Sequence, residues 1–106
     1  MVAMRAFAAL ADPTRRHIVE LLAGGERSAG DLARRFTLTQ PAVSQHLRAL
    51  RDARLVRVRR DAQRRMYSLN PRGLAQIDAW LSRYRAFWTM RLDALERALQ
   101  AEDKHK

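Results

Sequence analysis

The segment from residue 29 to residue 69 constrains the fold of this chain more than any other part of it. Two short amphipathic stretches, separated by a four-residue break, precede two stretches in which apolar residues alternate with arginines. The first pattern predicts two helices joined by a turn, and the second predicts a β-hairpin. This is the order of a winged helix-turn-helix, in which the hairpin is called the wing. We therefore expect a mainly α fold with a small β-hairpin, in the order α-α-α-α-β-β-α.

Capping residues mark where the elements begin and end. The pair Asp12-Pro13 offers an oxygen acceptor and a first-turn proline to a second helix, and Gly24-Gly25 predicts a left-handed end for it. Ser28, with an acidic residue three positions later, resembles a capping box. The expected helices are Met4–Leu10, Pro13–Ala23, Ser28–Phe36, Thr39–Ala53 and Arg72–Ala101, and the expected strands are Leu55–Arg60 and Arg64–Leu69, with a turn at Asp61-Ala62-Gln63.

Positive charge is concentrated in the same central segment. Residues 27–65 hold eleven arginines and three aspartates, which is +8 of the net charge of +10, whereas the first 26 residues sum to zero. A local positive field attracts a phosphate backbone and speeds encounter with it. A solvated basic face is the alternative interpretation, and charge alone favours neither.

The fourth expected helix has one apolar and one polar side. Val43, Leu47 and Leu50 form a stripe that suits a core, and the opposite arc is polar. Short polar groups near a helix N-terminus suit contacts with base edges, and arginines further along suit phosphates. Any amphipathic surface helix would show the same periodicity. The predicted DNA-contacting residues of this helix are Thr39, Gln40, Pro41, Ser44, Gln45 and Arg48.

The expected hairpin carries arginines at its tip. Val56, Val58 and Tyr67 alternate with polar residues and predict one face packed on the helices. Because a lone hairpin is marginally stable, it must rest on that face, and its tip then projects from a rigid base. Such a tip suits a narrow minor groove, although charge also protects an edge ribbon from aggregation. The predicted DNA-contacting residues of the wing are Arg59, Arg60, Arg64 and Arg65.

The last expected helix has more apolar surface than one small core needs. It would span about 45 Å, and apolar residues recur along it at steps of three and four. The same helix in a second copy is the economical partner, which predicts a homodimer joined through residues 1–11 and 72–101, with 102–106 as a frayed tail. The aromatic residues at 80, 84, 87 and 88 suit packing or, less simply, a ligand pocket. The predicted interface residues are Met4, Phe7, Leu81, Tyr84, Trp88, Leu92 and Leu95.

Composition excludes several classes of function. At 106 residues we expect one domain, residues 1–106. The chain has no cysteine, so it has neither disulfides nor thiolate metal sites. No apolar window is long enough to span a membrane. Together these two observations favour a cytoplasmic location. The histidines, His17, His46 and His105, show no ligand spacing. No catalytic motif is present, and we expect no enzyme activity, no metal and no cofactor.

The phrases LADPTRRHIVELL, DLARRF and LTQPAVSQHLRALRDARLVRVRRDAQRRMYSL, with the aromatic helix WLSRYRAFW, resemble the ArsR/SmtB family of bacterial winged-helix repressors over nearly the whole chain. The resemblance implies a homodimer that binds an imperfect palindrome near a promoter and blocks transcription. It also implies DNA contacts from Gln40, Pro41, Ser44 and Gln45, and from a basic wing over residues 59–65. Metal-sensing members carry a cysteine pair near the helix that matches residues 31–36, so this chain resembles a subgroup without that metal site.

Three hypotheses for function follow. The first is a dimeric transcriptional repressor that binds double-stranded DNA, with its own gene as one candidate target. The second is a winged helix that recruits another polypeptide through its long helix. The third, an RNA-binding domain, is disfavoured because an A-form major groove does not admit a helix. Three alternatives are open for how such a repressor is regulated. It responds to an organic inducer, it is displaced from DNA by another protein, or it represses its own gene as its concentration rises.

Overall fold

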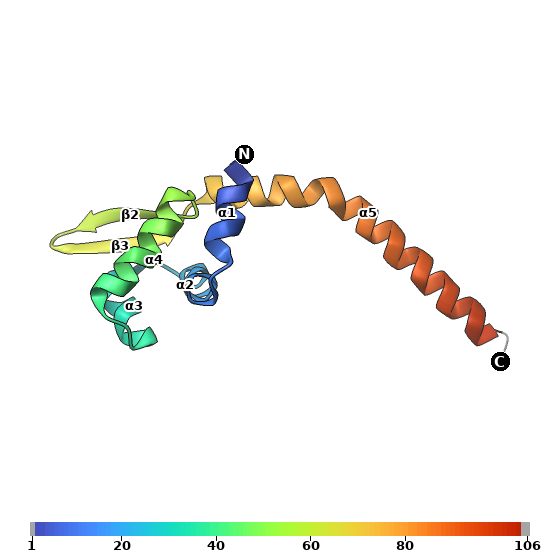
Figure 1. The fold of residues 1–106 in the computed structure, drawn as a ribbon, viewed down its shortest axis with the longest axis horizontal. Helices are drawn as coiled ribbons and strands as arrows, with labels where there is room; N and C mark the ends of the chain where they lie inside the picture. The colour runs from blue at the N-terminus through green and yellow to red at the C-terminus, as the bar shows by residue number, and fades with distance from the viewer. Residues whose placement is uncertain (1, 105–106) are drawn as a thin grey trace.

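The computed structural model describes residues 2–104. Its helices and strands occur in the predicted order, with one strand added near residue 27 (Figure 1). The first four helices and the sheet form a body from which the fifth helix extends as a long arm, so the molecule measures 68 × 30 × 20 Å. The elements are α1 (Val2–Leu10), α2 (Pro13–Ala23), β1 (Arg27–Ser28), α3 (Ala29–Phe36), α4 (Gln40–Asp52), β2 (Val56–Asp61), β3 (Arg64–Leu69) and α5 (Pro71–Lys104).

The three predicted N-caps are confirmed. The Asp12 carboxylate accepts hydrogen bonds from two backbone N–H groups of the first turn of α2, at 2.8 and 3.1 Å. Ser28 Oγ accepts from the Asp31 N–H at 3.1 Å, and Thr39 Oγ1 accepts from the Ala42 N–H at 3.2 Å. Each cap satisfies a donor that the helix itself leaves unpaired, which fixes where the helix begins.

Two predicted turns are wrong in detail. Gly24 ends α2 with φ −82°, a right-handed conformation, and the positive φ falls one residue later, at Gly25 with 141°. The chain thus completes the helix at Gly24 and reverses toward β1 at Gly25. In the hairpin, Asp61 pairs with Arg64, so the turn has two residues and not three, and Ala62 takes a left-handed φ of 57°.

Strand β1 was absent from the predicted elements. It pairs with β3, where Arg27 lies opposite Tyr67, and gives a three-stranded antiparallel sheet in the order β1-β3-β2. A strand of two residues is too short to show the alternation by which strands are predicted. Its effect is to connect the start of α3 to the wing.

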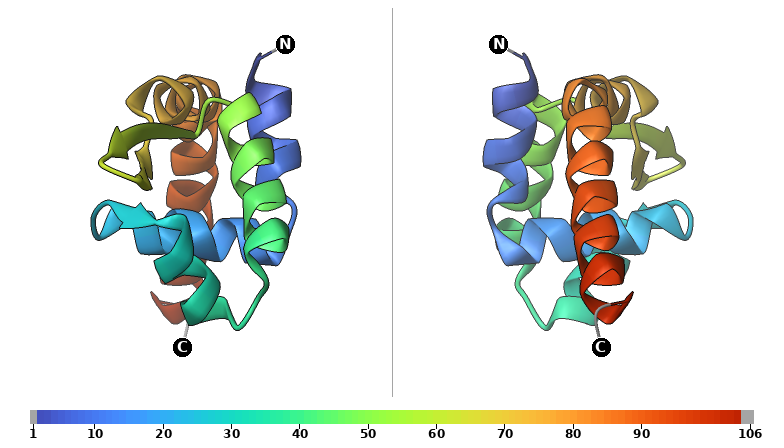
Figure 2. Two further views of the ribbon diagram at one scale, coloured as in Figure 1. Left: turned by 90° about the vertical axis from the view of Figure 1, so that its left-hand side faces the viewer. Right: turned by 90° about the vertical axis from the view of Figure 1, so that its right-hand side faces the viewer.

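The core lies where the helices meet the inner side of the sheet. Val43, Leu47 and Leu50 are at most 1% exposed, which confirms the predicted stripe of α4. Figure 2 shows α1 and α4 side by side, with α2 crossing below them. In α2 the core position belongs to Ile18, whereas His17 is exposed and its ring meets the edge of Phe36 at 4.9 Å.

The first turn of α5 rests on the base of the wing. Gly73 is buried, and a Cβ on it would overlap the backbone carbonyl of Arg54, the residue two positions before β2. The Asn70 N–H also donates to the Leu55 carbonyl at 2.9 Å. Only glycine permits so close an approach of two backbones. The beginning of the long helix and the beginning of β2 are therefore in direct contact.

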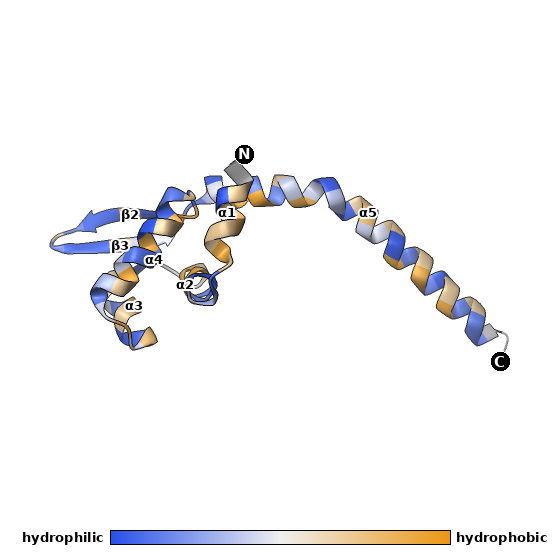
Figure 3. Ribbon diagram, in the orientation of Figure 1, coloured by the Kyte–Doolittle hydropathy of each residue, from blue (hydrophilic) through white to orange (hydrophobic). Residues whose placement is uncertain are grey.

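Beyond its first three turns, α5 leaves the body. Every residue from 81 to 103 is exposed, and Figure 3 shows apolar residues recurring along this arm while the wing is hydrophilic. Residues 102–104, which belong to the predicted frayed tail, form the last turn of α5, and residues 105–106 lie outside the described part of the chain. That this tail frays stays a prediction. No helix within residues 2–104 is long and apolar enough to cross a bilayer.

Candidate nucleic-acid interface

Helix α4 presents a continuous polar surface opposite its buried stripe. All six residues predicted to contact DNA from this helix are exposed. The turn before α4 is tight, because Thr37 adopts a left-handed φ of 52° and the Leu38 N–H returns to the Ala33 carbonyl at 3.1 Å. Helices α3 and α4 therefore form the predicted helix-turn-helix pair, with the second helix projecting its polar side. The exposed residues are Thr39, Gln40, Pro41, Ser44, Gln45 and Arg48.

The wing has two faces of different character. Its inner face, defined by Val58 and Tyr67, packs on the helices, and alternation along the strands places Arg60 and Arg65 on that same side near the tip. Arg60 and Arg65 lie directly opposite each other across the hairpin. The outer face carries Arg59, which pairs with Met66. The predicted arginine tip is thus divided between two sides of the sheet.

A groove connects the helix pair to the wing. It has a volume of about 510 Å³ and is bordered by Gln40 and Ser44 of α4, by Arg64 and Arg65 of the wing, and by the first turn of α3. Arg65 also borders a second hollow of about 260 Å³, which is lined as well by Arg51 from the end of α4 and by Arg59 and Arg60 of β2. The fold therefore brings predicted residues from both elements to one concave, positively charged surface.

Other predicted residues lie beside these hollows. Thr39, Pro41, Gln45 and Arg48 border neither one, and remain on the exposed side of α4. The groove adds residues that sequence reasoning missed, namely Ser28, Gly30 and Arg34 at α3. Arg34 belonged to the basic segment, but only the fold shows that α3 begins beside the wing.

Ion pairs restrict some of the arginines. Arg59 donates to both carboxylate oxygens of Glu26, at 2.8 Å from Nε and 2.6 Å from Nη2. These hydrogen bonds lower the pKa of Glu26 below its ordinary value and raise that of Arg59. Arg64 has a longer contact with Asp61, at 3.4 Å. Within residues 2–104, Arg60 and Arg65 form no ion pair with an acidic side chain.

Asp31 serves the first turn of α3 and not the interface. Its carboxylate accepts from Arg27 at 3.0 Å and from Arg35 at 3.3 Å, and Arg34 lies 3.7 Å away. The Arg27 hydrogen bond is the main reason that the pKa of Asp31 is lowered. Asp31 therefore anchors β1 to α3, whereas the predicted capping box gave it only a helix-capping role.

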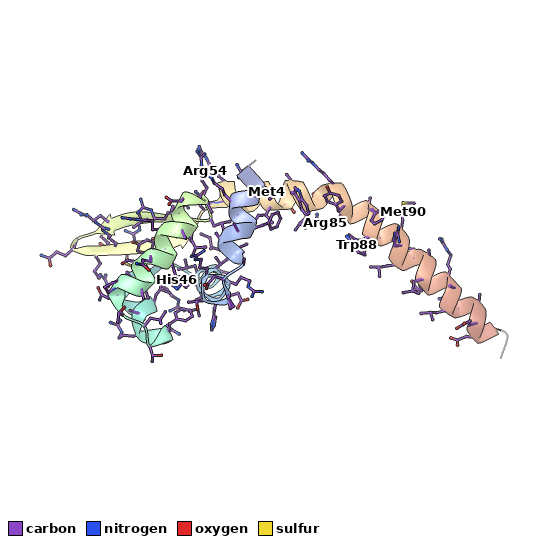
Figure 4. All side chains as sticks on the ribbon, in the orientation of Figure 1. Met4, His46, Arg54, Arg85, Trp88 and Met90 are labelled. Atoms are coloured by element: carbon purple, nitrogen blue, oxygen red, sulfur yellow. The ribbon has the colours of Figure 1, made fainter. Side chains whose placement is uncertain are left out.

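His46 occupies a structural position. The Arg15 Nε–H donates to His46 Nδ1 at 3.3 Å, which places His46 between α2 and α4, as Figure 4 also shows. Within residues 2–104, no three His, Asp or Glu side chains gather closely enough to hold a metal ion. His105 lies outside the described residues.

The predicted interface residues of the arm are exposed in the single chain. Trp88 is 60% exposed, and Phe7 is half-buried because its ring meets the edge of Trp80 at 5.0 Å. The aromatic cluster divides into a Trp80–Tyr84 pair, with centroids 4.7 Å apart, and a Phe87–Trp88 pair at 5.8 Å. The second pair is exposed, so it does not enclose a pocket within one chain. Also exposed are Met4, Leu81, Tyr84, Leu92 and Leu95.

A helix-turn-helix whose second helix exposes a polar side next to a basic wing defines the winged-helix class of DNA-binding regulators. Comparison with known proteins narrows the class. Residues 12–58 match the model of the bacterial regulatory proteins of the arsR family.

Individual relatives extend the match along the chain. The HTH-type transcriptional regulator Rv2034 of Mycobacterium tuberculosis is 48% identical over 98 residues, which is 92% of this chain and 89% of the relative. The transcriptional repressor SdpR of Bacillus subtilis is 41% identical over 75 residues, 71% of this chain and 83% of SdpR. An ArsR-like regulator from Rhodococcus sp. RHA1, with a solved structure, superposes with a TM-score of 0.72 at 31% identity and 91% coverage of both chains.

The chain belongs to the ArsR family. It is a DNA-binding transcriptional regulator and not an enzyme, as the fold and these relatives agree.

Proposed function

We propose that this regulator is a dimeric repressor that binds an imperfect palindrome in double-stranded DNA, including its own promoter region. The observation that carries the proposal is the groove in which Gln40 and Ser44 of α4 lie next to Arg64 and Arg65 of the wing. Polar side chains near the helix N-terminus can read base edges in the major groove, while the wing arginines bind the flanking backbone. Two relatives of this chain, SdpR and the arsenical resistance operon repressor of Staphylococcus xylosus, are repressors, which supports repression.

Dimerisation is supported by the arm. Leu81, Trp88, Leu92 and Leu95 are 43 to 61% exposed. They lie on one side of the part of α5 that extends beyond the body, where every residue from 81 to 103 is exposed. A second copy of α5 offers the same stripe in return, which is the self-complementary surface that a twofold dimer needs. Two α4 helices held about 34 Å apart would then enter successive major grooves. In this proposal residues 1–106 act as one domain, with 1–11 and 72–101 as its dimerisation elements.

The test is binding of the purified protein to its own upstream region and to random duplex of equal length. We expect the upstream region to compete at least a hundredfold better, and affinity to fall steeply between about 50 and 200 mM salt. A protein that remains monomeric at micromolar concentration, or that ignores both duplexes in dilute buffer, would refute the proposal.

A second candidate function rests on the same exposed arm. An interaction module would use the apolar stripe of α5 to bind a different polypeptide, and its arginines would serve solubility. Such a protein would show no preference between duplexes and would be monomeric without its partner, so the same experiment separates the two functions. A cytoplasmic location and an organic inducer stay predictions.

A further inference from the structure

Glu26 holds one wing arginine in a fixed position. It lies just before β1, 33 residues from Arg59 in the sequence, and its two carboxylate oxygens receive two separate guanidinium N–H groups. This two-point geometry is the strongest arrangement that an arginine and a carboxylate can form, and it fixes direction as well as distance. The ion pair joins β2 to the start of β1 across the intervening strand β3.

Arg60 and Arg65 are in the opposite situation. They lie directly across from each other on the inner face, and they border one small hollow that Arg51 and Arg59 also line. Like charges on directly opposed strand positions repel each other. A phosphate oxygen in that hollow would relieve the repulsion, whereas Arg59, which also borders the hollow, already has Glu26 as its counter-charge. Within residues 2–104, Arg59 and Arg64 thus each have an acidic partner, and Arg60 and Arg65 have none.

We propose that Glu26 withholds Arg59 from the DNA backbone, so that the wing contacts phosphates through its other tip arginines, Arg60, Arg64 and Arg65, with Arg51 of α4 beside them. The proposal rests on the DNA-binding function proposed above and adds a positioning residue to it. Glu26 sets how many wing cations displace counterions from a duplex, and with that the salt dependence of binding. The lowered pKa of Glu26 agrees with a carboxylate that stays ionised at neutral pH and keeps its hold on Arg59.

The first experiment compares Glu26→Gln with Glu20→Gln. Glu20 is exposed on α2 and forms no ion pair within residues 2–104, so its substitution changes net charge equally without releasing an arginine. Binding to random duplex is followed by fluorescence anisotropy over a range of salt concentrations. We expect E26Q to steepen the plot of log affinity against log salt by about 0.9 for each wing on the duplex. Equal slopes for E26Q and E20Q would overturn the proposal.

The second experiment keeps the proposal testable if E26Q is poorly folded. Arg59→Gln should leave the salt slope of the unsubstituted protein unchanged, and Arg65→Gln should reduce it by about 0.9 per wing. An equal reduction by R59Q and R65Q would show that Arg59 binds phosphate despite Glu26, and would overturn the proposal. If the unsubstituted protein binds no duplex, the proposed DNA-binding function is refuted. If it binds but E26Q does not change the salt slope, only the role of Glu26 is refuted.

Discussion

Replacing Trp88 by alanine should separate the two copies of the proposed dimer. An aromatic side chain buries about 150 to 250 Å². Trp88 is 60% exposed in the single chain, which leaves roughly 100 to 150 Å² for a partner to cover. At about 25 cal/mol per Å², its loss costs about 2.5 to 4 kcal/mol per copy and about 5 to 7.5 kcal/mol per dimer. The dimer dissociation constant should therefore rise by about four to five orders of magnitude.

Sedimentation equilibrium over a dilution series measures that constant. Met90→Ala is the matched control, because Met90 is even more exposed, at 71%, but lies about 160° around α5 from Trp88. Figure 4 shows the two side chains on different sides of the arm. We expect M90A to dimerise like the unsubstituted protein. We expect W88A to bind its upstream region more weakly, in proportion to the loss of dimer. Equal weakening by both substitutions, or none by W88A, would refute the assignment of the stripe to the interface.

Three further predictions concern DNA reading, packing and acid stability. Gln45→Ala should reduce the preference for the upstream region over random duplex, whereas Arg64→Ala should weaken both about equally; a competition assay decides, and equal loss on both duplexes for Q45A would contradict its role in base reading. Gly73→Ala should lower the free energy of unfolding in urea by about 1 to 3 kcal/mol or more, since its Cβ meets backbone, whereas Gly24→Ala, at φ −82°, should change it by less than about 1 kcal/mol. Backbone hydrogen bonds from Arg15 and Thr14 lower the pKa of Asp12, so its capping contribution is complete above about pH 4 and is lost as the pH falls through the lower folded-state pKa. Asp12→Asn should keep the cap but flatten this acid decline of the melting temperature, and an unchanged decline would contradict the assignment.

Local rules predicted most of the fold. The caps at Asp12, Ser28 and Thr39 and the stripe of α4 follow from residues within one or two turns of each other, and all are confirmed. The details that failed depend on where the chain goes next. Gly25 takes the positive φ because the chain must reach β3, and β1 exists only because β3 is beside it.

In the candidate interface, too, features set by neighbouring residues were predicted, and features set by distant parts of the chain were not. The exposure of Gln40, Ser44 and Gln45 could be read from the wheel, since the buried stripe defines the opposite side. The partner of Arg59 could not be predicted, because Glu26 lies 33 residues away from it. The cross-strand pairs could not be predicted either, because the hairpin register depends on a turn that was predicted one residue too long. The contribution of α3 to the groove likewise depends on tertiary packing.

The contact at Gly73 has a mechanical consequence. The first turn of α5 touches the Arg54 carbonyl with no side chain between them, so the joint has no compressible layer to take up movement. If α5 rotates about its axis, this backbone contact passes the movement to the base of β2. In the proposed dimer, a change in how the two copies of α5 pack would therefore reorient both wings without touching the surface proposed to bind DNA.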